Sequence, residues 1–439
     1  MPNLRYTFRL ISAFFKRFKV LIIIGVALGV LFFVALSFLL PILSGRGTQV
    51  VGVTGRYTVS TLPNQILSKI GDGLTKLDAD GSVTNGLATS WETPDKGKTW
   101  IFKLNPDVTW QDGKKITSNT LNYQFSDVTV ENPDAGTIVF KLQNPYSAFP
   151  SVVSKPAFKK GLLGTGEWEV KKLSLAGSYV DQITLVNEQK QKIIYKFYPT
   201  EERTKLAFQM GVVNEIHDIF VPSPFDTWKM VKMDKTYNKG EYVAVFFNTQ
   251  DKIFADKNVR QALSYAINKD SFVENRAISP ISLDSWAYNP QVKQYNYDLG
   301  KAKSMLSNLP SEVRNGLTVN LSTVPILLKT AEGIAKDWEA VGIKTNIHVV
   351  SAIPSDYQAF LAIFDIPEDP DQYSIWHSTQ TGTNITHYQN PRIDKLLEDG
   401  RSQINIEDRK KTYFDFQKYL VEDAPSAFLY YPNIYTIKR

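Results

Sequence analysis

The chain has 439 residues, which is too long for one ordinary hydrophobic core and favours two or more lobes. It has no cysteine, which excludes disulfides, thiolate nucleophiles, thiolate metal sites and a lipid-modified cysteine. The net charge of +6 comes from the first 46 residues, which hold six basic residues and no acidic one, while the other 44 basic residues are balanced by 44 acidic ones. The composition therefore gives no support for a nucleic-acid-binding surface.

The N-terminal segment is predicted to be a membrane anchor. Val20–Leu43 is a run of 24 residues without a charge, enough for a helix of roughly 36 Å that crosses a bilayer with some tilt. Three basic residues at positions 16–19 precede it, which predicts a cytoplasmic basic segment at 1–19, a transmembrane helix at 20–43 and the remainder outside. A cleaved signal peptide is the alternative, but the run is longer than a signal h-region and lacks a clear small-x-small cleavage site.

The segment after the anchor favours a small β-rich subdomain followed by a β-α-β unit. Residues 45–55 read as a linker, and residues 73–140 are dense in turn sequences between short strands such as Thr99–Leu104 and Thr137–Leu142. Lys192–Tyr198 is a predicted strand, and Thr200 is placed to cap a helix that Gly211 ends. Residues 215–221 read as the next strand.

A second β-α-β unit is predicted far downstream. Leu317–Thr323 and Ile343–Val350 read as strands, and Leu327–Ala340 between them reads as a helix. A strand at 241–249, an amphipathic helix at 259–267, helices near 391–401 and 407–421, and strands at 427–431 and 434–437 complete the pattern. Two separated β-α-β regions predict two α/β lobes with a cleft between them.

The sequence offers no convincing catalytic or metal-binding motif. Neither a phosphate loop, nor a dinucleotide fingerprint, nor a G-x-S-x-G turn is present. The four histidines, His217, His348, His377 and His387, do not have metal-ligand spacing. We therefore expect no enzyme activity, no cofactor and no metal.

One segment, Phe364–Asn384, is chemically unusual. It places four carboxylates beside two prolines, and aromatic and amide side chains follow: Asp365, Glu368, Asp369, Asp371, Tyr373, Trp376 and Asn384. The carboxylates could serve as an acid–base pair, as an anion for a ligand ammonium group, or as a solvated acidic loop. The residues alone leave these three interpretations open.

An ordered set of short motifs resembles a known family. Residues 70–125 contain Gly73-Leu74, Asp80-Gly81, Gly86-Leu87-Ala88, Trp91, Trp110 and Asp112-Gly113. Later pieces are FFNT at 246–249, VRQALSYAINKD at 259–270, YNYDLGKAKSML at 295–306 and YQNPRIDKLLEDGR at 388–401. Over about residues 50–437 the chain is similar to the family 5 extracellular solute-binding proteins, the oligopeptide and dipeptide receptors of ABC importers.

This resemblance implies an α/β, two-lobed periplasmic-binding-protein-like (type II) fold with an extra β-rich subdomain at about 72–150. The chain is expected to leave lobe I near Asn248 and return near Ala424, so that lobe I comprises 44–248 and 424–439 and lobe II comprises 249–423. A peptide is expected to lie between the lobes and pass unaltered to a permease and its ATPase subunits. The receptor is expected to be a monomer.

The resemblance also implies the ligand-binding residues. In the peptide receptors an aspartate pairs with the α-amine of the ligand, and Asp365 is the best match. Asp369 is the alternative, because the segment DIPEDPD is longer than the family pattern. The other expected ligand-binding residues are Tyr373, Trp376, Asn384, Asn64 and Asn248.

Two departures from the family pattern leave the ligand class open. The stretch between Phe125 and Thr137 is short, and Ser60–Ile66 lacks the customary Asp-Pro. Nickel complexes and glycans are therefore alternatives to peptides. A sensor without a transport role and, less favoured, an anchored extracellular hydrolase are alternatives to an import receptor.

Overall fold

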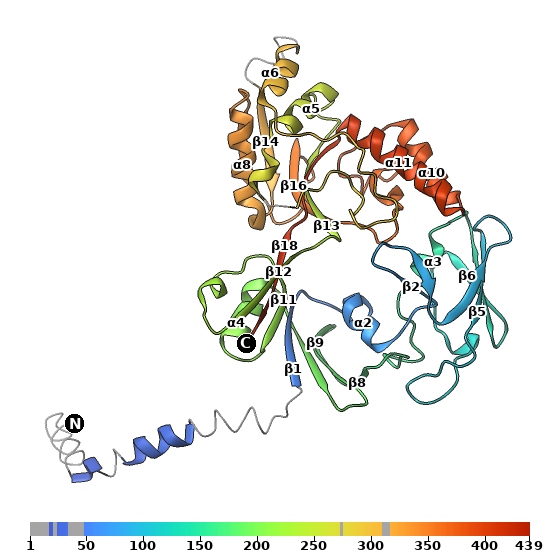
Figure 1. Ribbon diagram of the computed structural model, residues 1–439, viewed down its shortest axis with the longest axis vertical. Coiled ribbons are helices and arrows are strands. Elements are labelled where there is room, and N and C mark those ends of the chain that lie inside the picture. The colour runs from blue at the N-terminus through green and yellow to red at the C-terminus, as the bar shows by residue number, and fades with distance from the viewer. Residues whose placement is uncertain (1–16, 21–23, 34–47, 273–274, 310–316) are drawn as a thin grey trace, which may run out of the picture.

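The computed structural model describes residues 17–20, 24–33, 48–272, 275–309 and 317–439 (Figure 1). Residues 24–33 are helical, and the predicted membrane span at 20–43 lies partly outside the described residues. Within the described ranges, no helix combines the length and the apolarity that a membrane crossing requires.

Lobe I is built on a seven-stranded mixed sheet in the order β12-β18-β11-β1-β10-β9-β8. The strands are β1 (Thr48–Thr54), β8 (Glu169–Ala176), β9 (Tyr179–Val186), β10 (Lys192–Tyr198), β11 (Glu215–Ile219), β12 (Lys232–Tyr237) and β18 (Asn433–Lys438). Its helices are η1 (Val59–Thr61), α2 (Asn64–Ile70), α4 (Glu201–Gln209) and η3 (Phe225–Thr227). The predicted β-α-β unit is confirmed as β10-α4-β11, because both strands run parallel to β1 between them and the Thr200 side chain caps α4.

The β-rich subdomain is also confirmed. It consists of a four-stranded antiparallel sheet in the order β4-β5-β7-β6 and a hairpin, β2-β3. Its elements are β2 (Thr75–Leu77), β3 (Val83–Asn85), β4 (Ala88–Glu92), β5 (Thr99–Leu104), η2 (Ser118–Thr120), β6 (Val128–Asp134), β7 (Thr137–Leu142) and α3 (Phe149–Val152). The core is aromatic: Phe140 lies 5.7 Å from Phe102 and 5.0 Å from Phe149 between ring centroids.

Lobe II is built on a five-stranded sheet in the order β15-β14-β16-β13-β17. The strands are β13 (Glu241–Phe247), β14 (Thr318–Thr323), β15 (Lys344–Val349), β16 (Ala359–Asp365) and β17 (Ser426–Tyr430). The helices are α5 (Lys257–Ala266), η4 (Lys269–Ser271), α6 (Leu299–Ser307), η5 (Pro325–Leu327), α8 (Leu328–Glu339), α9 (Tyr373–Trp376), α10 (Pro391–Ser402) and α11 (Ile406–Asp423). The second predicted β-α-β unit is confirmed as β14-α8-β15, whose strands are parallel neighbours.

The crossings between the lobes differ from the predicted boundaries. β13 pairs with β16 and β17 in the sheet of lobe II, so the chain crosses at 238–240 and returns at 431–432. Asn248 and Ala424 therefore lie within lobe II. The reason is that β13 is buried along almost its whole length, as expected for a central strand with a partner on each side.

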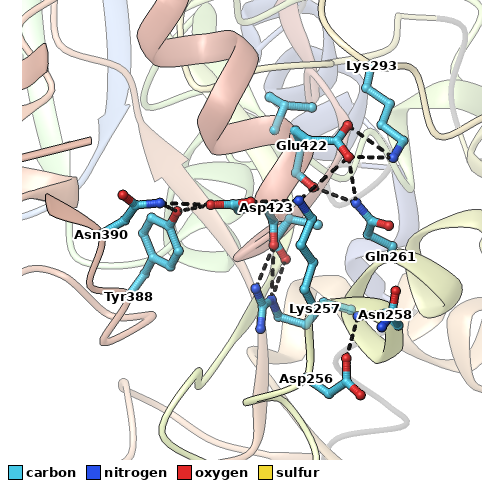
Figure 2. A network of polar contacts seen from close by, with 12 residues as sticks. Asp256, Lys257, Asn258, Gln261, Lys293, Tyr388, Asn390, Glu422 and Asp423 are labelled. Carbon is cyan, nitrogen blue, oxygen red and sulfur yellow. Dashed lines mark hydrogen bonds and ion pairs between the residues drawn. The ribbon is translucent and has the colours of Figure 1, made fainter. Parts of the chain in front are cut away.

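A polar network ties the two ends of the lobe II chain together (Figure 2). Lys257 Nζ lies 2.8 Å from Asp423 Oδ1, and the other oxygen of Asp423 accepts hydrogen bonds from Tyr388 Oη and Asn390 Nδ2. The network joins the start of α5, the end of α11 and the segment before α10. The last of these segments leads into α10, which extends toward the subdomain (Figure 1).

Candidate ligand-binding cleft

A cleft lies between lobe I with its subdomain and lobe II. Two hollows of about 580 Å³ and about 1400 Å³ share five lining residues and so form two ends of one cleft: Asn64, Pro156, Ile366, Pro367 and Glu368. The smaller end also includes the crossing residues Lys239 and Gly240. A cleft of this size between lobes is typical of a small-molecule or peptide site.

Asp365 lies in the larger end of this cleft. It is the last residue of β16, it is exposed, and its partner across the antiparallel ladder is Glu241, the first residue of β13. Burial, and then the negative charge of Asp365, raises the pKa of Glu241 to about 7. Glu241 Oε2 is buried and has no hydrogen-bond partner among the described residues. The position predicted for a ligand ammonium group therefore holds one exposed carboxylate, Asp365, beside a carboxyl group that keeps its proton up to about pH 7.

The other two aspartates of the acidic segment already have cationic partners. Asp369 is buried, and its two oxygens lie 2.8 and 3.3 Å from the Nη2 and Nη1 atoms of Arg409. Asp371 is also buried and accepts a hydrogen bond from Arg401 Nε at 2.9 Å. Both aspartates line the cleft, but these ion pairs leave Asp369 poorly placed to bind a ligand amine, and the geometry favours Asp365.

Four of the predicted ligand residues lie away from both hollows. Tyr373 stacks on His377 with ring centroids 4.1 Å apart and lies against the Arg401 guanidinium. Trp376 is the last residue of α9 and is buried in the core of lobe II. Asn384 is buried and donates to the Tyr388 carbonyl at 2.9 Å, so its amide holds a loop.

Asn248 and Asn64 have opposite outcomes. Asn248 follows β13 at the end of the strand away from the crossing, and its side chain donates a hydrogen bond to the Tyr357 carbonyl at 2.9 Å. The sequence predicted that Asn248 lies at the crossing itself. Asn64 is the first residue of α2, is exposed, and lines both ends of the cleft. Of the seven predicted ligand residues, Asp365 and Asn64 therefore have side chains that are both exposed and placed in the cleft.

The sequence did not indicate that the turn between β2 and β3 reaches across the cleft to lobe II. The turn between β2 and β3 touches lobe II, where Trp286 N donates to the Asp80 carbonyl at 2.9 Å. A Cβ atom added to Gly81 would lie 2.7 Å from the Glu368 carbonyl oxygen. The sequence DADGS indicates a turn, but nothing in it indicates what the turn contacts.

The subdomain makes a second contact with lobe II through the segment that follows β7. Ser147 N donates to the Arg401 carbonyl at 2.7 Å, and Ser147 Oγ donates to the Gly400 carbonyl at 3.0 Å. The Arg401 guanidinium also lies 4.9 Å from the centroid of the Tyr146 ring. The end of α10 thus joins lobe II to the subdomain, opposite the two crossings.

Comparison with known proteins supports the fold and the family. Residues 82–384 match the family described as bacterial extracellular solute-binding proteins, family 5 middle region. The chain belongs to this family. The oligopeptide-binding protein AppA of Bacillus subtilis (strain 168) is 26% identical, over 88% of this chain and 86% of that protein.

Two solved structures show the same fold. The structure of AppA from Bacillus subtilis in complex with a nonapeptide has a TM-score of 0.66 and 22% identity, over 89% of this chain and 94% of that chain. The structure of NikZ from Campylobacter jejuni in complex with Ni(L-His) has a TM-score of 0.69, 22% identity and the same two coverages. Among the described residues of this solute-binding protein, no group of three or more histidines or carboxylates is arranged to hold a metal ion.

Proposed function

We propose that this solute-binding protein captures peptides between its two lobes and delivers them to the permease of an ABC importer. The observation that carries the proposal is an interlobe cleft in which Asp365 is exposed at the end of β16. The relatives named for oligopeptide and dipeptide binding, which cover most of the chain, support the same ligand class. The peptide is released intact, because the family consists of binding proteins.

Binding proceeds by closure of the lobes. The two short crossings at 238–240 and 431–432 are the only covalent connections between the two sheets in the described part of the chain, so they act as the hinge. A ligand that touches both walls stabilises the closed form over the open one. The closed form then docks on the permease. The proposed helix at 20–43 holds the receptor at the extracytoplasmic surface of the cell membrane. This attachment raises the local concentration of the receptor near the permease.

Asp365 pairs with the α-amine of the peptide. Titration calorimetry with a short alanine peptide and its N-acetylated form tests this role. Asp365→Asn should weaken binding of the free peptide by about thirtyfold or more, because the desolvated ammonium loses its charged partner. The acetylated peptide should bind weakly to both proteins. Asp107→Asn is the matched control, since Asp107 is exposed and lies outside the cleft. Unchanged affinity in Asp365→Asn contradicts the assignment.

The anchor is tested separately by fractionation of cells that express the full chain. The protein should be found with the membranes, and its N-terminal peptide should be detected by mass spectrometry of the purified protein. A mature N-terminus between residues 36 and 50 would show that the segment is cleaved instead.

A further inference from the structure

The smaller end of the cleft contains a buried glutamine whose side-chain amide has no partner. Gln372 lines this hollow and is 0% exposed. Neither its Nε2 atom nor its Oε1 atom has a hydrogen-bond partner among the described residues. Buried polar groups in folded proteins are almost always hydrogen-bonded, because taking them out of water without a partner costs free energy. An amide in this state therefore indicates that a group from outside the folded chain completes its hydrogen bonds.

A second buried glutamine in lobe II shows how a structural amide is satisfied in this protein. Gln417 is also 0% exposed. Its Nε2 and Oε1 atoms together make four hydrogen bonds of 2.8 to 3.1 Å, to Ala287, Tyr413, Ser279 and Asn289. These four bonds use the full hydrogen-bonding capacity of the amide. Burial in lobe II is thus compatible with complete pairing, and the amide of Gln372 differs from that of Gln417 in its surroundings.

The segment that carries Gln372 is held in place by other contacts. Its backbone carbonyl accepts hydrogen bonds from Ile375 N and Trp376 N at 3.1 and 3.0 Å, at the start of α9. The preceding residue, Asp371, is paired with Arg401. The side-chain amide of Gln372 makes no capping bond to α9. The amide is therefore not needed to fix the backbone, and it is presented by a segment that is already ordered.

The chemistry of a primary amide restricts the ligand group that can satisfy it. Gln372 offers both a donor and an acceptor, whereas an ammonium group would pair with Oε1 alone and a carboxylate with Nε2 alone. Its neighbours in the buried part of the lining, Ile281 and Pro370, have apolar side chains. Another amide matches both atoms, with one hydrogen bond in each direction. A peptide supplies this match from its backbone, where the N–H and C=O of one residue in a strand pair with the same partner, or from an asparagine or glutamine side chain.

We propose that Gln372 binds an amide group of the ligand in the smaller end of the cleft and so determines specificity there. The inference rests on the proposed peptide-binding function and extends it from the amino terminus of the ligand to a later residue. Asp365 takes the α-amine in the larger end. Ile366 and Pro367 line both ends, so an extended peptide runs along this segment from Asp365 toward Gln372.

Gln372→Met tests the proposal, because methionine has a side chain of similar length without the two hydrogen-bonding groups. Replacing an unpartnered buried amide by an apolar group of similar shape should leave the melting temperature of the ligand-free protein at or above that of the wild type. Ligand affinity should fall by about tenfold, since two hydrogen bonds to the ligand are lost. Both quantities are measured on the full-length protein, by thermal unfolding and by titration calorimetry.

The choice of peptides identifies the source of the amide group. The ligands are tri-alanine and tripeptides of alanine that carry glutamine, or methionine in its place, at the second or third position. If the backbone of the ligand is the partner, every peptide should lose about tenfold in Gln372→Met. If a side chain is the partner, one of the glutamine peptides should bind the wild type about tenfold more tightly than its methionine counterpart, and the variant should remove this difference.

Gln417→Met is the matched control, because it removes a buried amide whose partners all lie within lobe II. It should lower the melting temperature and leave peptide affinity unchanged. Unchanged affinity for every peptide in Gln372→Met overturns the inference and leaves the peptide function standing. A melting temperature that falls as far in Gln372→Met as in Gln417→Met also overturns it, since the amide would then be holding the fold together. If no peptide binds the wild type, the peptide function fails, and the role of Gln372 fails with it.

Discussion

At the scale of single residues, the acidic segment divides into side chains that face the cleft and side chains that hold lobe II together. Asp365 and Glu368 are exposed, while Asp369 and Asp371 are buried against Arg409 and Arg401. Asp369→Asn should lower the free energy of unfolding by about 3–5 kcal/mol, because it leaves a buried guanidinium without its charged partner. Thermal unfolding measures the effect. Asp365→Asn, the matched change at an exposed site, should not destabilise the protein, and equal losses in the two variants would contradict the division.

Glu241 gives stability a pH dependence at the same site. Its pKa is raised from its ordinary value of 4.5 to about 7, first by burial and second by the charge of Asp365. Between these values the folded protein keeps a proton that the unfolded chain has released, so raising the pH favours unfolding. The stabilisation is complete below about pH 4.5 and is lost as the pH rises through about 7, an effect of about 1–2 kcal/mol after allowing for partial exposure to water.

The test of Glu241 is the unfolding free energy of Glu241→Gln across this pH range. The variant should be more stable than the wild type at about pH 8 and should show a flatter pH profile. Asp365→Asn should reduce the slope in the wild-type background, since the neighbouring charge is one cause of the raised pKa. A parallel profile for wild type and Glu241→Gln would assign the pH dependence to other groups.

At the scale of elements, the β2–β3 turn is both a turn and a contact between lobes. Gly81 has a φ of 78°, and an added Cβ would lie 2.7 Å from the Glu368 carbonyl oxygen. Gly113 has nearly the same φ of 76°, but an added Cβ would meet nothing within 4 Å. Alanine should cost about 1–2 kcal/mol of stability at either position from backbone strain alone.

A comparison of these two glycines separates the effect of the contact between the lobes from the effect of backbone strain. Gly81→Ala should also weaken ligand binding by about tenfold, because the methyl group pushes the turn away from lobe II and disfavours the closed form. Gly113→Ala should keep the wild-type affinity. Calorimetry and thermal unfolding on both variants give the comparison, and an equal loss of affinity in both would mean that the turn does not take part in closure.

At the scale of the whole molecule, the two lobes meet at the crossings, at the β2–β3 turn and at the end of α10 (Figure 1). The latter two contacts consist of a few hydrogen bonds and side-chain contacts, so we expect closure to be reversible and to depend on the ligand. Ligand at about one hundred times its Kd should raise the free energy of unfolding by about 2.7 kcal/mol and make the molecule more compact in small-angle scattering. A tightly bound ligand that changes neither quantity rules out the closure mechanism.

The sequence by itself determined the local elements and the family. The Thr200 cap, the apolar pattern of 259–267 and the turn sequences of 73–140 depend on near neighbours, so they could be interpreted without knowledge of the fold. The ordered motifs then indicated two lobes and the family. The choice of Asp365 also came from a local motif.

Only the tertiary structure decided which charges are available to a ligand. Asp369 and Arg409 are 40 residues apart, and Asp371 and Arg401 are 30 apart, so their pairing depends on how α10 and α11 pack against the acidic segment. Trp376 and Asn384 are likewise buried by contacts within lobe II, and the lobe boundary follows from the pairing of β13 with β16 and β17. The approach of Gly81 to Glu368 joins the subdomain to lobe II. These contacts are non-local, because each depends on how distant segments are placed in space, and a local pattern in the sequence contains no information about that placement.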